Sequence, residues 1–301
     1  MKIEEAASLY MAEKRQTRRS NTCEGYESAL RCHVLPRWGD VEIDEIDPDD
    51  VQRWVWGFDK PGAAEKAFKT LRQVLRWAIR KMRLRIWLPT EGVELPRKPH
   101  YEPEVLDARE MGDLQRGMWG HPLEALVLVA SDLGTRPGEA SAVNLERDVD
   151  WRTGRVRVGR SRQTVRGREE TFDAKTEKSN RSLYLSGHAL RRLRQLRRSV
   201  RGGDLLRGLR PDQAYRRIKA HCRRAGLPWV GMRNLRHSWA TLAIESGVGI
   251  ETVALMLGHT EIGTAYEHYI RPRKSVCREA QRAVEAAIIN AAGRPEARAA
   301  A

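Results

Sequence analysis

A proline-rich stretch one third of the way along the 301-residue chain limits its fold more than any other feature. Residues 89–103 carry four prolines and show no periodic pattern of apolar residues. Because proline lacks a backbone N–H and interrupts helices and strands, such a segment is typical of a linker. The sequence therefore predicts two domains, at 1–88 and 104–301, joined by a linker at 89–103. Both are long enough to bury a core.

Apolar residues recur with the period of a helix throughout the first predicted domain. This pattern predicts helices at about 3–14, 21–33, 48–57 and 62–82. The last helix has a basic side opposite its apolar side, which a solvated helix face explains as well as DNA contact does. The basic residues that we take as candidates for DNA binding are Lys69, Arg72, Arg76 and Arg80.

The second predicted domain mixes helices with short strands. The helices are predicted at 122–134, 137–145, 187–200, 211–225, 234–246, 250–257 and 275–291, followed by a polar tail. Alternating residues predict strands at 155–158, 170–174 and 181–185, with a polar turn at 176–180. The predicted fold class is therefore mainly α with a small antiparallel β-sheet, in which a helical domain precedes an α+β domain.

The balance of charge favours an anionic partner. The chain has 55 Lys and Arg against 40 Asp and Glu, a formal net charge of +15. Residues 191–224 are the densest basic stretch, and like charges packed on helices repel one another. Each phosphate that they neutralise releases counterions, so double-stranded DNA is the first partner to consider. A solvated basic surface without a ligand is the alternative.

Several other classes of protein are disfavoured. No apolar run approaches the ~20 residues of a membrane span, and the N-terminus is acidic where a signal peptide is basic, so we expect a cytoplasmic protein. The four cysteines lie far apart without a C-x-x-C motif, which indicates neither a disulfide framework nor a zinc site. No P-loop motif is present either. We therefore expect no metal and no nucleotide cofactor.

Five short motifs carry residues suited to chemistry at a phosphate. They are Gly134-Thr-Arg136-Pro-Gly-Glu139, Ala174-Lys175-Thr176, Arg233-Asn-Leu-Arg236-His237, Leu257-Gly-His259-Thr and Tyr266-Glu-His-Tyr269. Substitution at a phosphodiester needs a nucleophile, donors to the two nonbridging oxygens and a proton for the leaving oxygen. Arginine suits the second task because its planar guanidinium is always charged and can bind phosphate with two hydrogen bonds.

Spacing places the arginines on predicted helices. Arg136 precedes a proline, which favours an extended backbone at the start of a helix, where anions are stabilised. Glu139 is expected to pair with Arg136 and orient its guanidinium. Arg233, Arg236 and His237 share one helix face if their helix begins by residue 233.

In this order and spacing, the motifs resemble the catalytic boxes of the tyrosine recombinase (phage integrase) family. That family has a G-x-R-x-x-E box, a hairpin lysine, an H-x-x-R-H box, an L-G-H box and then a tyrosine. The run Val34–Asp40 resembles its core-site DNA-binding domain, so the resemblance spans nearly the whole chain. It implies a site-specific recombinase or integrase of a phage or other mobile element, which cuts and rejoins DNA through a covalent 3′-phosphotyrosine.

The resemblance also implies roles for single residues. The catalytic residues are Arg136, Lys175, Arg233, Arg236, His259 and Tyr269, supported by Glu139 and His237. Lys175 is the general acid that protonates the leaving 5′ oxygen, with Lys178 as a competitor. Tyr269 is the nucleophile, with Tyr266 as a competitor, because the former better fits the family spacing from His259.

Arg233 departs from the family pattern, which has a histidine at this position. A guanidinium with a pKa above about 12 can donate to phosphate but cannot accept the proton of a tyrosine. That proton must pass to water, Glu139 or another histidine, or leave late in the reaction. Slow chemistry is one consequence, and an inactive DNA-binding regulator of the same fold is an alternative function. A type IB topoisomerase, which shares the chemistry, is another.

Recombination needs four active sites around two duplexes, so we expect a homotetramer on paired DNA sites and a monomer or dimer when free. The last predicted helix, 276–290, has an apolar side that could dock into a neighbouring subunit or cover its own core. An accessory protein that bends DNA or sets direction is a further possible partner. The separate arm-site module of some family members is expected to be missing.

Overall fold

The computed structural model describes residues 1–99, 101–174, 180–258, 282, 284–286 and 288–289. The chain divides into two compact units. One comprises Met1–Glu102 with Val165–Gly167, and the other comprises Pro103–Thr164 with Arg168–Ala301. The described residues are mainly helical with small β-sheets, which confirms the predicted fold class. In this part of the chain, no helix is long and apolar enough to cross a membrane.

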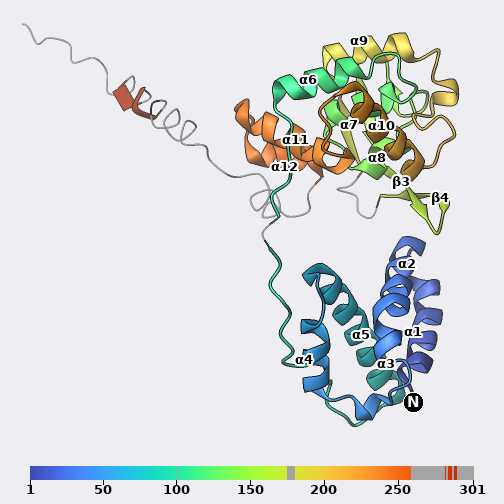
Figure 1. The fold of residues 1–301 in the computed structure, drawn as a ribbon. Coiled ribbons are helices and arrows are strands. Elements are labelled where there is room, and N and C mark those ends of the chain that lie inside the picture. The colour runs from blue at the N-terminus through green and yellow to red at the C-terminus, as the bar shows by residue number, and fades with distance from the viewer. Residues whose placement is uncertain (100, 175–179, 259–281, 283, 287, 290–301) are drawn as a thin grey trace, which may run out of the picture. The chain divides into compact units, whose positions relative to one another are not determined.

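The N-terminal unit is a bundle of helices, drawn in blue shades in Figure 1. It contains α1 (Ile3–Thr17), α2 (Ser20–Ala29), α3 (Leu35–Trp38), α4 (Pro48–Trp56) and α5 (Pro61–Met82), with a π-helical turn η1 (Leu30–Val34) and a 3-10 turn η2 (Ile43–Glu45). The helices predicted at 48–57 and 62–82 are confirmed to within a residue at each end. The helix predicted at 21–33 instead divides into α2 and η1.

The longest helix, α5, supplies much of this unit's core. Phe68, Leu71 and Leu75 are buried along one side of the helix, against Trp38 and other apolar side chains. Lys69, Arg76 and Arg80 are exposed on the other side. An amphipathic helix of this kind is stabilised by burial of its apolar stripe, which leaves its basic residues at the surface.

Part of the predicted linker packs on this bundle. Val93 and Leu95 lie against the hydrophobic core of the N-terminal unit. The amide of Gln52 donates to the carbonyl of Glu94 at 2.8 Å, and its oxygen accepts from the N–H of Glu94 at 2.8 Å. The chain therefore stays attached to the N-terminal unit at least as far as Leu95.

The second unit is built around an apolar helix, α7 (Glu124–Leu133). Its other helices are α6 (Ala108–Gly117), α8 (Pro137–Ala142), α9 (Gly187–Leu196), α10 (Pro211–Ala225), α11 (Met232–Glu245) and α12 (Ile250–Leu257), with a 3-10 turn η4 (Arg201–Gly203). Nine of the ten residues of α7 are buried, as expected for a helix that is apolar on nearly every side. Helices α6, α8, α9 and α11 contact it (Figure 1).

The described residues of the second unit form two small sheets. In the first, β2 (Arg155–Val158) pairs antiparallel with both β1 (Val149–Asp150) and β5 (Arg181–Tyr184). The second is a hairpin of β3 (Arg160–Val165) and β4 (Arg168–Asp173). Its turn residues, Arg166 and Gly167, have φ values of 48° and 74°. Positive φ at both positions is the geometry favoured in two-residue hairpins.

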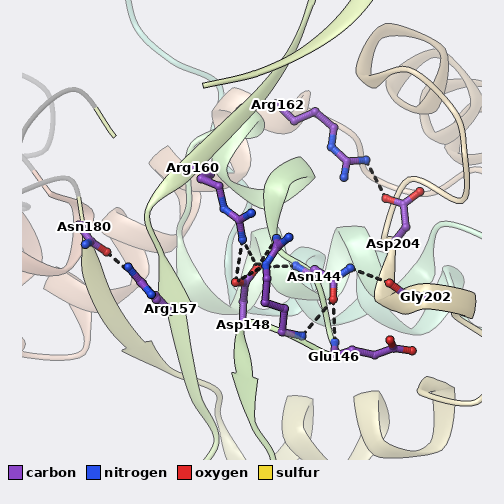
Figure 2. Close-up of polar contacts among 10 residues, drawn as sticks. Asn144, Glu146, Asp148, Arg157, Arg160, Arg162, Asn180, Gly202 and Asp204 are labelled. Carbon is purple, nitrogen blue, oxygen red and sulfur yellow. Dashed lines mark hydrogen bonds and ion pairs between the residues drawn. The ribbon is translucent and has the colours of Figure 1, made fainter. Parts of the chain in front are cut away.

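The sequence pattern did not predict β3, because polar contacts hold this strand in place. Every second residue reaches a carboxylate from a distant part of the chain. The pairs are Arg160 with Asp148 (2.9 Å), Arg162 with Asp204 (2.7 Å) and Thr164 with Asp212 (2.8 Å), and Figure 2 shows the first two. We call these three contacts the carboxylate ladder. A search for alternating apolar residues cannot detect such a strand.

Candidate active site

The motif that begins at Gly134 forms a tight connection between α7 and α8. Gly134 ends α7 with a left-handed backbone (φ 59°), and a Cβ atom there would lie 2.7 Å from the ring of Trp239. Both constraints require glycine. Arg136 follows with an extended backbone (φ −63°, ψ 151°) as the N-cap of α8, and Pro137 takes the first helical position. The sequence therefore places Arg136 at the mouth of a helix.

Glu139 is a buried carboxylate to which arginines come from three elements. Arg136 donates from Nη1 to Oε1 at 2.9 Å, and its backbone N–H donates to Oε2 at 2.9 Å. Arg181 on β5 donates to both oxygens, at 3.1 and 2.9 Å. Arg236 on α11 places Nη1 4.0 Å from Oε2. We call Glu139 with Arg136, Arg181 and Arg236 the arginine cluster.

Exposure differs sharply among these three arginines. The side chains of Arg181 and Arg236 are 9% and 6% exposed, whereas that of Arg136 is 43% exposed. A guanidinium has five N–H donors, and Arg136 uses only some of them in hydrogen bonds with Glu139 and Gly258. Arg136 can therefore offer donors to an incoming anion while Glu139 keeps it oriented.

The ionisation of Glu139 is fixed by its surroundings. Burial by itself would raise the pKa of this carboxyl, because a charge is costly away from water. The hydrogen bonds from Arg181, its charge and the contacts from Arg136 outweigh burial and lower the pKa below its ordinary value. Glu139 is therefore a carboxylate at neutral pH and a poor proton acceptor.

The end of α12 meets the same cluster. The carbonyl of Gly258 accepts from Nη2 of Arg136 at 3.1 Å, and the carbonyl of Leu257 accepts from Nη2 of Arg236 at 2.8 Å. Nη1 of Arg236 also donates to the carbonyl of Gly134 at 3.3 Å. Two arginines from motifs far apart in the chain thus lie in one site, as the motifs led us to expect.

Arg233 and His237 lie at different depths on the same helix. Helix α11 begins before residue 233, so the predicted spacing on one face holds, but Arg236 is buried and Arg233 is exposed. Arg233 borders an open depression of about 600 Å³ that Pro137 and Trp229 also line. His237 is half-buried. Arg233 is therefore accessible to a large ligand in this depression, which also reaches Pro137, the residue after Arg136.

Tyr215 fixes the start of α8 through hydrogen bonds of its hydroxyl. Its hydroxyl donates to the carbonyl of Pro137 at 2.8 Å and lies 2.7 Å from Oγ of Ser141. Burial raises the pKa of Tyr215 to about 12, despite the opposing hydrogen bond with Ser141. The Tyr215 hydroxyl therefore holds the backbone at Pro137, next to Arg136 in the chain. Its raised pKa makes it a poor nucleophile.

Sequence reasoning missed Arg181, although a signal was present. In β5, Leu183 is buried while Ser182 and Tyr184 are exposed. Arg181 lies two residues before Leu183, and side chains two residues apart in a strand point to the same face. A charged residue on the buried face of a strand requires a carboxylate partner, which is Glu139.

Three predicted catalytic residues lie outside the described residues: Lys175, His259 and Tyr269, together with the competitors Lys178 and Tyr266. Most of the last predicted helix lies outside them too. The residues before Lys175 and His259 are described. The N–H of Ala174 donates to the carbonyl of Gly159 at 2.8 Å, and Gly258 contacts Arg136. His259 is therefore one peptide bond away from a residue in contact with the arginine cluster.

The candidate DNA-binding residues of α5 fall into two pairs. Lys69 forms an ion pair with Glu65 at 2.7 Å, and Arg72 lies 3.7 Å from Glu91. Arg76 and Arg80 are exposed on the same helix.

Across the described ranges, no three His, Cys, Asp or Glu side chains are grouped so that they could hold a metal ion.

Two family models match the chain. Residues 2–57 match the phage integrase N-terminal SAM-like domain, and residues 118–275, more than half of the chain, match the phage integrase family. The putative prophage phiRv2 integrase of Mycobacterium tuberculosis is 27% identical over 272 residues, which cover 82% of this chain and 70% of the relative. A XerC-like tyrosine recombinase of Caldanaerobacter subterraneus is 24% identical, with 87% and 77% covered.

Solved structures agree on the fold. The Tn1549 transposon integrase in complex with transposon right end DNA has a TM-score of 0.78 at 14% identity and covers 95% of this chain and 100% of its own. A lambda integrase dimer bound to a COC′ core site has a TM-score of 0.66 at 16% identity, with 89% and 95% covered. The chain belongs to the phage integrase family and is a tyrosine site-specific recombinase.

Proposed function

We propose that this protein cuts and rejoins double-stranded DNA at a specific site, for a phage or another mobile element, through a covalent 3′-phosphotyrosine at Tyr269. The observation that carries the proposal is the convergence of Arg136 and Arg236 on Glu139 and on the end of α12. The integrase names of the matched relatives support the mobile-element setting.

The cluster is suited to a phosphate with developing negative charge. Donors held in place before the reaction stabilise such charge without the cost of reorganisation. Arg136 is fixed by its contacts with Glu139 and Gly258 and still has donors exposed to solvent. In the proposed complex, Arg136 and Arg236 bind the nonbridging oxygens of the scissile phosphate, and Arg233 adds a donor from the neighbouring depression.

The proposed reaction exchanges one phosphate ester bond for another. The phenol oxygen of Tyr269 attacks phosphorus, the bond to the 5′ oxygen breaks, and Lys175 gives its proton to that leaving oxygen. The phenol proton passes to solvent. Attack by a 5′ hydroxyl from the partner strand then breaks the phosphotyrosine bond and restores the phenol. Because the ester bond energy is kept, no nucleotide is consumed.

Proton acceptance is the weak point of this site. Arg233 stands where the family has a histidine, and its guanidinium cannot take a proton. Glu139 is ionised, but its lowered pKa and its arginine contacts make it a poor base. We therefore assign no base among these residues. In the proposal, His259 contacts the phosphate or the nucleophile, and His237 supports Arg236 from the adjacent position on α11.

A trapping experiment tests this proposal even though the DNA site is unidentified. The full chain is incubated with a duplex library of randomised sequence that carries one nick per molecule, so that cleavage near the nick releases a short strand and prevents religation. We expect DNA that stays attached to the protein in SDS, with Tyr269→Phe abolishing the adduct and Tyr266→Phe retaining it. Absence of any adduct from the wild-type protein would overturn the proposal.

The arginine at position 233, where the family has a histidine, favours one alternative function. This is a DNA-binding regulator that has lost the cleavage reaction. The same library separates the two functions, since a regulator enriches specific sequences in noncovalent complexes and yields no adduct. A topoisomerase activity would appear as relaxation of supercoiled plasmid without exchange between two captured sites.

DNA binding by the N-terminal unit is part of the proposal. Each phosphate contact contributes about one unit to the slope of log affinity against log salt. Arg76→Ala and Arg80→Ala are expected to lower that slope by about one each. Lys69→Ala should lower the slope less than these two variants, because Lys69 already pairs with Glu65.

Assembly on DNA is proposed by analogy with a related fold. A lambda integrase tetramer has been solved on a Holliday junction, and it has a TM-score of 0.67 with this chain at 16% identity. We propose a homotetramer on paired sites and a monomer or dimer off DNA. An accessory DNA-bending or directionality protein is a further candidate partner, and recombination by the purified chain alone would argue against a strict need for one.

A further inference from the structure

Arginines from three different elements donate to the carbonyls of the last two residues of α12 and of its C-cap, Gly258. Nε of Arg181 donates to the carbonyl of Met256 at 2.7 Å. The carbonyls of Leu257 and Gly258 accept from Arg236 and Arg136 in the same way. The last carbonyls of a helix have no partner within the helix and carry the negative end of its dipole, so cations stabilise them. The end of α12 is therefore docked on the arginine cluster.

Arg181 joins the two parts of this arrangement. One edge of its guanidinium holds both oxygens of Glu139, and Nε holds the end of α12. It also packs against Gly258, where a Cβ atom would lie 3.0 Å from Nη1 of Arg181. Gly258 has a left-handed backbone (φ 67°) as well. Position 258 therefore has little room for any other residue, and Arg181 is held by three directional hydrogen bonds.

We propose that Arg181 is a positioning residue for strand cleavage: it fixes Glu139 and the end of α12 in one geometry, and thereby sets where the chain leaves toward His259 and Tyr269. The inference rests on the proposed function, because it concerns the placement of the proposed nucleophile relative to Arg136. Arg181 itself needs no contact with DNA in this role, because its guanidinium is already engaged by Glu139 and by the carbonyl of Met256.

A lysine cannot replace Arg181 in this role. An ammonium is a compact charge, whereas the guanidinium is a flat fork that donates in fixed directions to two carboxylate oxygens and to a carbonyl at once. Without that fork, Glu139 keeps Arg136 but can rotate, and the carbonyl of Met256 loses its donor. A misplacement of about 1 Å at a reacting centre can cost about 10²-fold in rate.

The test compares Arg181→Gln and Arg181→Lys with the wild-type chain on a nicked duplex recovered from the library above. Both variants should form adduct about 10²-fold more slowly, with DNA affinity unchanged. A matched control is Arg192→Gln. Arg192 donates to both oxygens of the buried Glu124, at 2.5 and 3.0 Å, and Glu124 is not part of the arginine cluster. This control should lose stability but keep the cleavage rate.

A pH profile separates positioning from general stability. Removing Arg181 takes away the largest effect that offsets burial of Glu139, so the pKa of Glu139 should rise. Arg136 and Arg236 remain beside it. Glu139 also lines a cavity whose other charged residues are Arg147, Asp148, Arg157, Arg160 and Asp173. The acid limb of the cleavage profile should therefore move to higher pH in Arg181→Gln and stay in place in Arg192→Gln.

Each outcome decides the matter. Wild-type cleavage rates in both Arg181 variants would overturn the inference alone. So would a loss of cleavage rate that follows a loss of DNA affinity, or an equal loss of rate in Arg192→Gln at the same fall in melting temperature. No adduct from the wild-type chain would overturn the proposed function and the inference with it. Arg181→Lys keeps a positive charge beside Glu139, and so provides a folded variant if Arg181→Gln does not fold.

Discussion

The arginine cluster around Glu139 and the carboxylate ladder along β3 both join arginines to carboxylates, and they differ in the burial of their arginines. The carboxylates Glu139 and Asp148 are both less than 10% exposed, and the difference lies in the arginines. Arg181 and Arg236 are 9% and 6% exposed beside the exposed Arg136, whereas Arg160 and Arg162 of the ladder are 30% and 18% exposed. Deep in a protein, an unpaired charge is much more costly than near the surface. Removal of a charged side chain should therefore cost more stability in the cluster than in the ladder.

The largest expected effect is on stability. In Glu139→Ala, two buried guanidinium groups lose their carboxylate, and we expect a loss of about 3–5 kcal/mol in the free energy of unfolding. In Arg160→Ala, Asp148 keeps its contacts with Arg147, and we expect a loss of up to about 1 kcal/mol. Urea denaturation of both variants measures the difference. Equal losses would mean that burial does not distinguish the two regions.

The second expected effect is on cleavage. Removing a preorganised donor from a developing charge typically costs about 10²–10³-fold, so Arg236→Lys should slow adduct formation by this factor if Arg236 binds the phosphate. Arg162→Lys changes a ladder arginine in the same way and should leave the rate near that of the wild type. Single-turnover assays on a captured nicked duplex measure both. A strong effect of Arg162→Lys would place the ladder in the active site as well.

Sequence patterns predicted these two regions unequally, for a physical reason. Arg136, Glu139 and Arg236 belong to short motifs with a recognisable chemical task, so their convergence could be expected before the fold was known. The members of the ladder have no such motif, and Asp204 and Asp212 follow their partners by 42 and 48 positions. Contacts of this kind depend on the fold and leave no periodic pattern in the sequence.

The helices, unlike these contacts, do leave a periodic pattern in the sequence. Burial of an apolar stripe is a local pattern, so α5 and α10 were predicted almost to the residue. The strand β3 escaped because its anchored residues are Arg160, Arg162 and Thr164, which form a polar segment in the sequence. Arg181 could be predicted only in part. The alternation in β5 placed it on the buried face, but no local pattern identified Glu139 as its partner.

A third prediction uses acid to test the ionisation of Glu139 in the arginine cluster. The ordinary pKa of a glutamate is 4.5, and Glu139 lies below it in the folded chain. A carboxyl whose pKa is depressed by folding contributes stability above its unfolded value, and this contribution is lost as pH falls through the folded value. Stability should therefore fall below pH 4.5, and less steeply in Glu139→Gln. Urea midpoints between about pH 5 and pH 3 check this, and parallel curves for the two proteins would contradict it.

The smallest expected effect lies at the outer end of the ladder. The pKa of Asp212 is lowered to about 2, first by a hydrogen bond from Arg210 and next by one from Thr164. Thr164→Val removes the second hydrogen bond and keeps the shape of the side chain. The pKa of Asp212 should rise in this variant, but less than in Arg210→Gln, because the contact with Arg210 is the stronger cause.

Carboxyl titration followed by NMR measures both shifts, and amide exchange in the hairpin of β3 and β4 tests whether Thr164 anchors β3. If the hydroxyl is an anchor, Thr164→Val should speed that exchange, because the side-chain contact nearest the turn is lost. Arg210→Gln should shift the pKa of Asp212 without that change, since the side chain of Arg210 donates to Asp212 and leaves the hydroxyl of Thr164 in place. A hairpin that exchanges equally in both variants would show that Arg160 and Arg162 hold β3 without Thr164, and the carboxylate ladder would then end at Asp204.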